Sequence, residues 1–274
     1  MQSVNTNVGA FIALQNLNST SSQLQKTQQI ISTGLKVGSA KDDGATYAIA
    51  QSQRAAVASL DSVKDSLSRG SSVVDVAMSA GDSVTNLLTQ MKEKALAASD
   101  TSLDTTSRNA MQTDFNSLRD QITKTISNAT FNGINIINGT NASIAALANQ
   151  SGTSTITVTG QNMSLGGSIV TVATTASFST ATSASNLLTT LDTSINNVSA
   201  SLAKLGTSST ALQNHMTFVG KLQDSLNAGI GNLVDADMAS ESAKLQALQT
   251  KQQLGVQALS IANQSTSTVL SLFR

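Results

Sequence analysis

The sequence predicts a mainly α-helical protein, built as a long antiparallel helical rod of the coiled-coil type with a small β-hairpin portion. Apolar residues recur at steps of three and four over long stretches, which is the heptad spacing of packed helices. The 274 residues include no proline, so no helix is interrupted by one. A short central stretch instead alternates apolar and polar residues, as strands do. Because the helical stretches occupy both chain ends, each core domain is expected to combine residues from both ends.

The first predicted helix covers residues 10–35. Asn5 or Thr6 could cap its start, and Gly34 and Gly38 are expected to end it. Its apolar positions follow the three-four rhythm and consist of Ala10, Leu14, Leu17, Leu24, Ile31 and Leu35.

The second predicted helix covers about 45–99 and has the most regular seam in the chain. At 1.5 Å per residue it would be roughly 80 Å long. Ser39 and Asp42 have the spacing of a capping box, which predicts a helix start at that point. Gly70 and Gly81 on the seam indicate close approach by a neighbouring element. The seam consists of Ala56, Leu60, Val63, Leu67, Gly70, Val74, Ala77, Gly81, Val84, Leu88, Met91 and Ala95.

The rest of the chain predicts three further helices around a β-rich insert. A third helix follows a loop over 99–107, a fourth starts at about 185 and could extend to residue 233, and the last covers about 235–272. The last helix carries two apolar stripes, so one partner helix would cover only part of it. Between these helices, "FNGINIINGT" (131–140) reads as turn, short strand and turn, and "STITVTG" (154–160) and "SIVTVAT" (168–174) predict one or two β-hairpins.

The composition argues against several functional classes. The formal net charge is zero, whereas nucleic-acid binders carry basic patches. No cysteine is present, which removes disulfides and thiolate sites, and a single histidine, His215, cannot form a metal cluster. The adjacent Asp42 and Asp43 fit a helix start better than a catalytic pair. We therefore expect no catalytic, metal or cofactor site, and no transmembrane span or cleaved signal.

Several stretches at the two ends of the chain resemble bacterial flagellin, especially the short flagellins of alphaproteobacteria. The resemblance covers roughly residues 1–140 and 185–274. It rests on "VNTNVGAFIALQNLN" (4–18), "ISTGLKVGSAKDDGATYAIAQ" (31–51), "FNGINIINGT" (131–140) and "NQSTSTVLSLFR" (263–274).

The resemblance implies an extracellular filament subunit for swimming motility, exported by the flagellar type III route. It implies inner filament-core helices in 1–44 with 234–274, an outer core rod in 45–140 with 185–233, and a small insert in 141–184. Its ends would be disordered in the monomer and would order on assembly. Expected partners are further copies of the chain, an export chaperone at the C-terminal segment Leu245 to Arg274, and hook-associated and cap proteins.

The apolar residues expected to carry self-assembly lie on the two terminal helices. They are Leu14, Leu17, Leu24, Ile31, Leu35, Leu245, Leu254, Leu259, Ile261, Val269, Leu270, Leu272 and Phe273, with Arg274 at the end.

Three positions depart from flagellins that the Toll-like innate receptor detects. Those members resemble this chain but carry Arg and Leu where it has Gln90 and Lys94, and Glu where it has Asp114. Loss of a bidentate donor and an apolar contact predicts weak receptor activation.

Two other classes compete with the filament subunit. A hook–filament junction or secretion-apparatus protein would share the helical ends but would be present in few copies. A signalling coiled coil would favour charged flanking positions, whereas only 12% of these residues are charged. No constellation of residues supports an enzyme.

Overall fold

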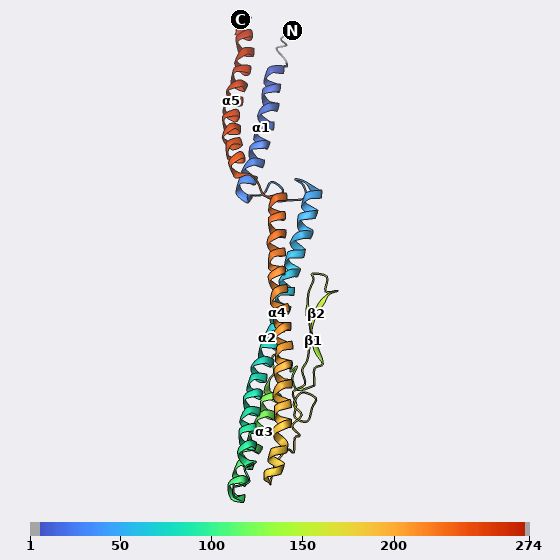
Figure 1. The fold of residues 1–274 in the computed structure, drawn as a ribbon. Coiled ribbons are helices and arrows are strands. Elements are labelled where there is room, and N and C mark those ends of the chain that lie inside the picture. Colours follow the sequence, from blue (N-terminus) through green and yellow to red (C-terminus); the bar gives the residue numbers. More distant parts are fainter. Residues whose placement is uncertain (1–5, 272–274) are drawn as a thin grey trace. The chain divides into compact units, whose positions relative to one another are not determined.

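The described residues of the computed structural model form five helices and one two-stranded sheet (Figure 1). The structure describes the backbone of residues 6–271 and the side chains of residues 6–264. The helices are α1 (Val8–Thr33), α2 (Gly44–Ala98), α3 (Thr105–Asn128), α4 (Ala181–Val234) and α5 (Met238–Ser271), and the strands are β1 (Ser143–Leu147) and β2 (Thr155–Thr159). The predicted fold class, mainly helical with a small β portion, is confirmed.

The chain divides into two compact units. Unit 1 contains Met1–Ala55 and Ser225–Arg274, and unit 2 contains Ala56–Asp224. Helices α2 and α4 contribute residues to both units, whereas α1 and α5 lie in unit 1 and α3 and the sheet lie in unit 2.

Two helix starts differ by a few residues from the prediction. Asn7, rather than Asn5 or Thr6, caps α1, because its Oδ1 accepts the backbone N–H of Ala10 at 3.0 Å. Asp42 accepts from Ser39, but these residues form a turn, so the predicted capping box is wrong. The neighbouring Asp43 starts α2 instead, accepting the N–H groups of residues 45 and 46.

The end of α1 is as predicted. Gly34 has φ 72° and donates its N–H to the carbonyl of Ile30 at 2.8 Å, which is the left-handed helix cap that glycine adopts without strain.

In unit 2, α2 and α4 run antiparallel, with Lys92 bound to Asp192 near one end and Gln223 bound to Asp61 at 2.8 Å near the other. Every predicted seam residue of α2 from Leu60 to Ala95 is buried. Gly81 allows the close approach of α4, since a Cβ added there would lie 2.6 Å from Leu202 Cδ2. The heptad pattern of α2 therefore describes a packed core.

The β-hairpin is real, but its predicted partner strand is wrong. β2 pairs antiparallel with β1, and Thr157 of β2 lies opposite Ala145 of β1. The Ala-rich strand β1 was not predicted. Residues 168–174 form no strand, although Val170 and Val172 are fully buried. Side chains of α4 satisfy this backbone instead: Ser194 Oγ accepts the N–H of residue 171 at 3.0 Å, and Asn197 donates to the carbonyls of residues 168 and 169. The alternating pattern of residues 168–174 therefore reflects the burial of Val170 and Val172. The side chains of α4 make the hydrogen bonds that a neighbouring strand would otherwise have made.

Residues 131–140 also contain no strand. Phe131 and Ile134 form an isolated bridge around a tight turn in which Asn132 and Gly133 have φ 50° and 78°. The remainder is held by Asn135, whose Oδ1 accepts from the N–H groups of residues 137 and 138.

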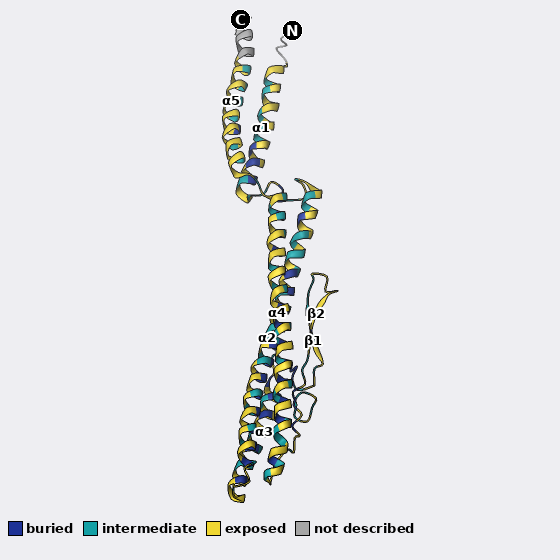
Figure 2. Ribbon diagram, viewed as in Figure 1, coloured by how far each residue is buried: buried dark blue, intermediate teal, exposed yellow. Residues whose placement is uncertain are grey.

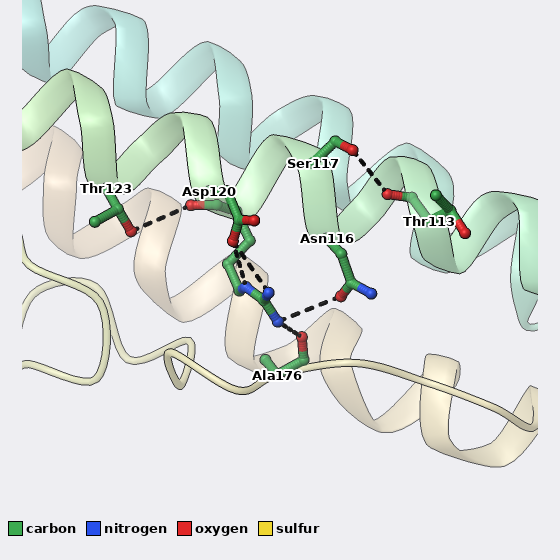
Figure 3. Close-up of polar contacts among 7 residues, drawn as sticks. Thr113, Asn116, Ser117, Asp120, Thr123 and Ala176 are labelled. Carbon is green, nitrogen blue, oxygen red and sulfur yellow. Dashed lines mark hydrogen bonds and ion pairs between the residues drawn. The ribbon is translucent and has the colours of Figure 1, made fainter.

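The irregular segment before α4 is anchored to α3. Arg119 donates to the Ala176 carbonyl at 2.9 Å and to Asp120 at 3.0 Å, next to Asn116 (Figure 3). Phe115 and Phe178 pack edge to face with ring centroids 5.2 Å apart, and both are fully buried. Unit 2 thus closes its core with α3 and a loop as well as with the α2–α4 pair.

Candidate functional site

The junction between the end of α1 and the end of α4 organises unit 1. Leu35 and Asp235 form an isolated antiparallel bridge, and Lys36 N donates to the Val234 carbonyl at 2.8 Å. Ala236 N donates to the Gly34 carbonyl at 2.9 Å. Residues about 200 positions apart are therefore held side by side, which sets where α5 begins relative to α1.

A charged turn follows this junction. The Ser39 hydroxyl donates to Asp42 at 3.0 Å and is the largest cause holding the pKa of that carboxyl below its ordinary value of 3.8. Lys26 lies 3.6 Å away and contributes in the same direction. The turn connects α1 to α2.

Helices α1 and α5 pack antiparallel along one face (Figure 1). Asn7 Nδ2 donates to the Ala262 carbonyl at 2.8 Å, and a Cβ added at Gly255 would lie 3.3 Å from Leu17 Cδ1. Leu24, Ile30 and Leu248 are buried in the seam, with Thr27. The terminal helices therefore cover each other on one side.

The opposite faces of these helices are apolar and exposed. On α1, Phe11 is 74% exposed, and on α5, Leu254 is 58% and Ile261 67% exposed. Figure 2 shows most of the described part of both helices as exposed. We call this set the outer apolar face; it comprises Val8, Phe11, Ile12, Leu14, Leu254, Val256 and Ile261.

The structure distributes the predicted assembly residues over both faces. Leu24 is buried in the α1–α5 seam. Leu17, Ile31, Leu35, Leu245 and Leu259 are half-buried, and Leu14, Leu254 and Ile261 are exposed. Val269 and Leu270 lie in the helical backbone of α5 but beyond the described side chains, and Leu272, Phe273 and Arg274 lie outside the described residues.

Four members of the outer apolar face were missed in the sequence. They are Val8, Phe11, Ile12 and Val256. A signal was available for α1, because Val8, Phe11 and Ile12 have the i, i+3, i+4 spacing of a second helical stripe. The heptad template followed only the first stripe, so a helix with two apolar faces was read as having one.

The three positions at which the chain departs from receptor-detected flagellins lie in unit 2. Gln90 is exposed on α2. Lys94 on α2 forms an ion pair with Asp114 on α3, with 2.7 Å between Nζ and Oδ2. Both members are about half exposed, so the pair adds little stability.

His215 occupies a structural position. Its Nε2 lies 2.7 Å from the Ala148 carbonyl at the end of β1, and so fixes the hairpin against α4. Over the described part of the chain, no three acidic, cysteine or histidine residues gather as a metal site would require. No described helix is long and apolar enough to cross a membrane.

Comparisons with known proteins agree with the terminal motifs. A family model for the bacterial flagellin N-terminal helical region matches residues 4–142, and one for the C-terminal helical region matches residues 188–273. Flagellin FljM of Caulobacter vibrioides is 61% identical over 274 residues, covering 100% of this chain and 99% of that protein. A flagellin of Brucella melitensis is 36% identical over 283 residues, covering 100% of both. The crystal structure of Bacillus cereus flagellin matches with a TM-score of 0.42 and 19% identity, over 66% of this chain and 94% of that one.

The predicted resemblance to alphaproteobacterial flagellins is thereby confirmed, and these matches favour a filament subunit over a junction protein. The family is one of structural proteins that polymerise into the bacterial flagellar filament. The chain therefore belongs to the bacterial flagellin family and is a structural subunit of the flagellar filament.

Proposed function

We propose that the outer apolar face of α1 and α5 is the surface through which one subunit packs against others inside the filament. The observation that carries this proposal is the exposure of Phe11 and Ile261, at 74% and 67%, on helices that already cover each other on their other side. Large apolar side chains grouped on an exposed helix face mark an interaction site rather than ordinary surface scatter.

The energetics favour assembly at this surface. Covering one Leu, Ile or Phe side chain contributes roughly 1.5–3 kcal/mol, and the outer apolar face holds seven apolar side chains. A two-helix pair alone is marginal, because ordering each residue opposes folding by about 1–2 kcal/mol. Neighbouring copies would supply the missing cover, and head-to-tail contacts that do not close into a ring generate a helical filament.

The proposed surface implies a separate place in the filament for each part of the chain. Residues 1–44 with 234–274 would line the filament interior, residues 45–140 with 185–233 would form the outer core, and residues 141–184 would be a small insert. The compact units support a similar division, with boundaries at residues 55 and 224.

The test replaces apolar by polar side chains on the outer apolar face. Phe11→Ser combined with Ile261→Ser should abolish filaments seen by electron microscopy, while circular dichroism of the monomer stays near that of the parent. A matched control, Gln15→Ser with Gln246→Ser, changes exposed polar residues on the same helices and should polymerise normally. Deleting residues 265–274 should also prevent normal filaments. Normal filaments from the Phe11/Ile261 variant would contradict the proposal.

The export chaperone is assigned to the segment Leu245 to Arg274. Support comes from the exposed Leu254 and Ile261, which a chaperone could cover before assembly. Calorimetric titration of the monomer with the cognate flagellar chaperone should lose affinity in Leu254→Ser with Ile261→Ser, but not in the Gln246→Ser control. Hook-associated and cap proteins are proposed to meet the same face at the filament ends. Binding of the purified monomer to a hook-associated or cap protein should therefore be lost in Leu254→Ser with Ile261→Ser.

The proposed location is the extracellular filament, reached by type III export. Mass spectrometry of sheared filaments should find the chain as an abundant component with an unprocessed N-terminal region. A low copy number there would support a junction protein instead.

We also propose that the protein activates the Toll-like receptor weakly because it carries Gln90, Lys94 and Asp114. Lys94 is already paired with Asp114, so it offers neither an apolar contact nor a free charge to a receptor. Reporter cells should respond weakly, and Gln90→Arg with Lys94→Leu and Asp114→Glu should raise the response. A strong response to the unchanged protein would refute this assignment.

A further inference from the structure

A small cavity opens on unit 2, the unit that does not contain the terminal helices α1 and α5. It lies among α2, the turn at residues 131–134 and β1, and its volume is about 140 Å³. Its apolar lining includes Val73, Phe131, Ile134 and Ile144. An apolar cavity of about 150 Å³ holds a benzene molecule, so this cavity has room for one phenyl ring.

A cation without a partner stands at the edge of this cavity. Arg69 lines the cavity and is exposed, and its guanidinium makes no hydrogen bond or ion pair within the described part of the chain. A guanidinium above the face of an aromatic ring gains cation–π attraction, and arginine makes such contacts more often than lysine. The cavity therefore combines the size of a phenyl ring with a charge that suits its face.

The same unit presents an exposed phenyl ring elsewhere on its surface. Phe218 on α4 is 56% exposed. Its ring lies against His215, with centroids 5.7 Å apart, and the His215 ring is itself held by the Ala148 carbonyl. Leu222, one helical turn further, is also partly exposed and widens the apolar spot. Phe218 is thus a positioned aromatic side chain that costs little entropy to bury in a partner.

We propose that Phe218 of one subunit inserts into the Arg69–Phe131 cavity of a second copy of this chain. The occupant is another copy because the family polymerises and because unit 2 carries both the ring and a cavity of matching size and charge. A knob and a hole at different places on one molecule make a heterologous contact, which generates an open helical filament when the rotation between subunits does not close a ring. The contact rests on the filament function and adds an interface in unit 2 to the outer apolar face of unit 1.

Cysteine crosslinking tests this contact directly, because the chain contains no cysteine. Ala145 lines the cavity and is exposed. Filaments assembled from a mixture of Phe218→Cys and Ala145→Cys subunits should give a crosslinked dimer with a short thiol–thiol reagent, whereas filaments of either variant alone should not. Thr207→Cys is the matched control for Phe218→Cys, since it is exposed on the same helix about three turns earlier. Equal dimer yields with Thr207→Cys would overturn the proposal.

A double-mutant cycle gives an independent readout. Phe218→Ala should raise the critical concentration for seeded polymerisation about tenfold or more, and Ala145→Phe, which fills the cavity, should do the same. The two changes together should do no more than either alone, because both remove one contact. The monomer's unfolding midpoint should be unchanged by Phe218→Ala. Unchanged critical concentrations, or effects that multiply, would overturn the contact.

The proposal for the outer apolar face and the proposal for the Phe218 contact can be disproved independently of each other. If the Phe218 and Ala145 variants polymerise like the parent while the Phe11/Ile261 variant does not, only the cavity contact is wrong. If the Phe11/Ile261 variant polymerises and the cycle behaves as described, only the assignment of the terminal helices is wrong.

Discussion

Unit 1 and unit 2 use the same heptad spacing and reach opposite degrees of burial. In unit 2, Val84, Leu88 and Met91 on α2 are all completely buried. In unit 1, Phe11 on α1 and Ile261 on α5 are among the most exposed apolar side chains of the described residues. The sequence pattern is similar, but the number of neighbouring elements differs.

The comparison shows that a helix stripe is buried only where enough partners surround it. The α2–α4 pair of unit 2 is covered further by α3, the hairpin and the 160–180 segment, which adds Phe178 to the core. The described part of α1 has α5 as its packing partner over most of its length. A pair of helices can cover one face of each member, so the second stripe of α1 and of α5 stays exposed in the single chain.

The largest expected effect is the difference in unfolding free energy between replacing a buried and replacing an exposed phenylalanine. Phe115→Ala should lower the free energy of unfolding of unit 2 by about 3–5 kcal/mol, because it leaves a cavity beside Phe178. Phe11→Ala should change monomer unfolding little and should impair polymerisation instead. Urea denaturation and a sedimentation assay of the two variants measure both quantities. Equal stability losses would show that the monomer's α1 is covered after all.

The next effect compares two glycines in long helices of unit 2. Gly206→Ala meets nothing within 4 Å and should raise the free energy of unfolding by about 0.5–1 kcal/mol through helix propensity. Gly81→Ala would place its Cβ against Leu202, so it should be less stable than Gly206→Ala by about 2 kcal/mol. Thermal unfolding of the pair measures the difference. Equal stabilisation by both would mean that α2 and α4 approach less closely than the structure has them.

A smaller effect probes the α1–α5 pair in unit 1. Asn7→Ala removes both the helix cap and the bond to the Ala262 carbonyl, and should cost about 1 kcal/mol of local stability. Asn7→Asp keeps an acceptor for the cap but cannot donate to that carbonyl, so it isolates the tie between the helices. Hydrogen exchange at the first turns of α1 distinguishes the two variants. Unchanged protection in both would show that this end of α1 is not held by α5.

The smallest effect concerns acid and should appear in both units. The Thr46 hydroxyl is the largest cause lowering the pKa of Asp43 below 3.8, and the Ser107 hydroxyl has the same role at Asp104. Because the folded-state pKa is lowered, each carboxylate stabilises the fold above about pH 4, and this contribution is lost as the pH falls through the folded pKa. Asn caps helices as well as Asp but does not titrate, so Asp43→Asn with Asp104→Asn should flatten the acid dependence of the unfolding midpoint. An unchanged acid profile would place the titrating groups elsewhere.

Local patterns predicted the helices well because helix formation depends on neighbours a few residues away. The seam of α2, the left-handed cap at Gly34 and the uninterrupted course of α4 to Val234 followed from spacing and from the absence of proline. The cap of α1 was missed by one or two residues, since several polar side chains at a helix start can accept the same N–H groups.

Strand pairing was the part that local patterns could not supply. Residues 154–160 read correctly as a strand, but β1 is rich in alanine and carries little strand propensity of its own. Residues 168–174 alternate because Val170 and Val172 turn inward, yet Ser194 and Asn197 of α4 satisfy their backbone. The choice of hydrogen-bond partner lies with residues far away in the sequence.

By itself, the sequence determined which segments become helices, which of their faces are apolar, and, through the motifs at both ends, the flagellin family. The tertiary structure decided which apolar stripe is covered and which is not: Leu24 and Leu248 are buried, whereas Phe11 and Ile261 are exposed. The physical reason is that periodicity is a property of a single helix, while burial depends on how many surfaces the folded chain can bring against it. In unit 2 those surfaces come from the chain itself, and in unit 1 other subunits would have to supply them.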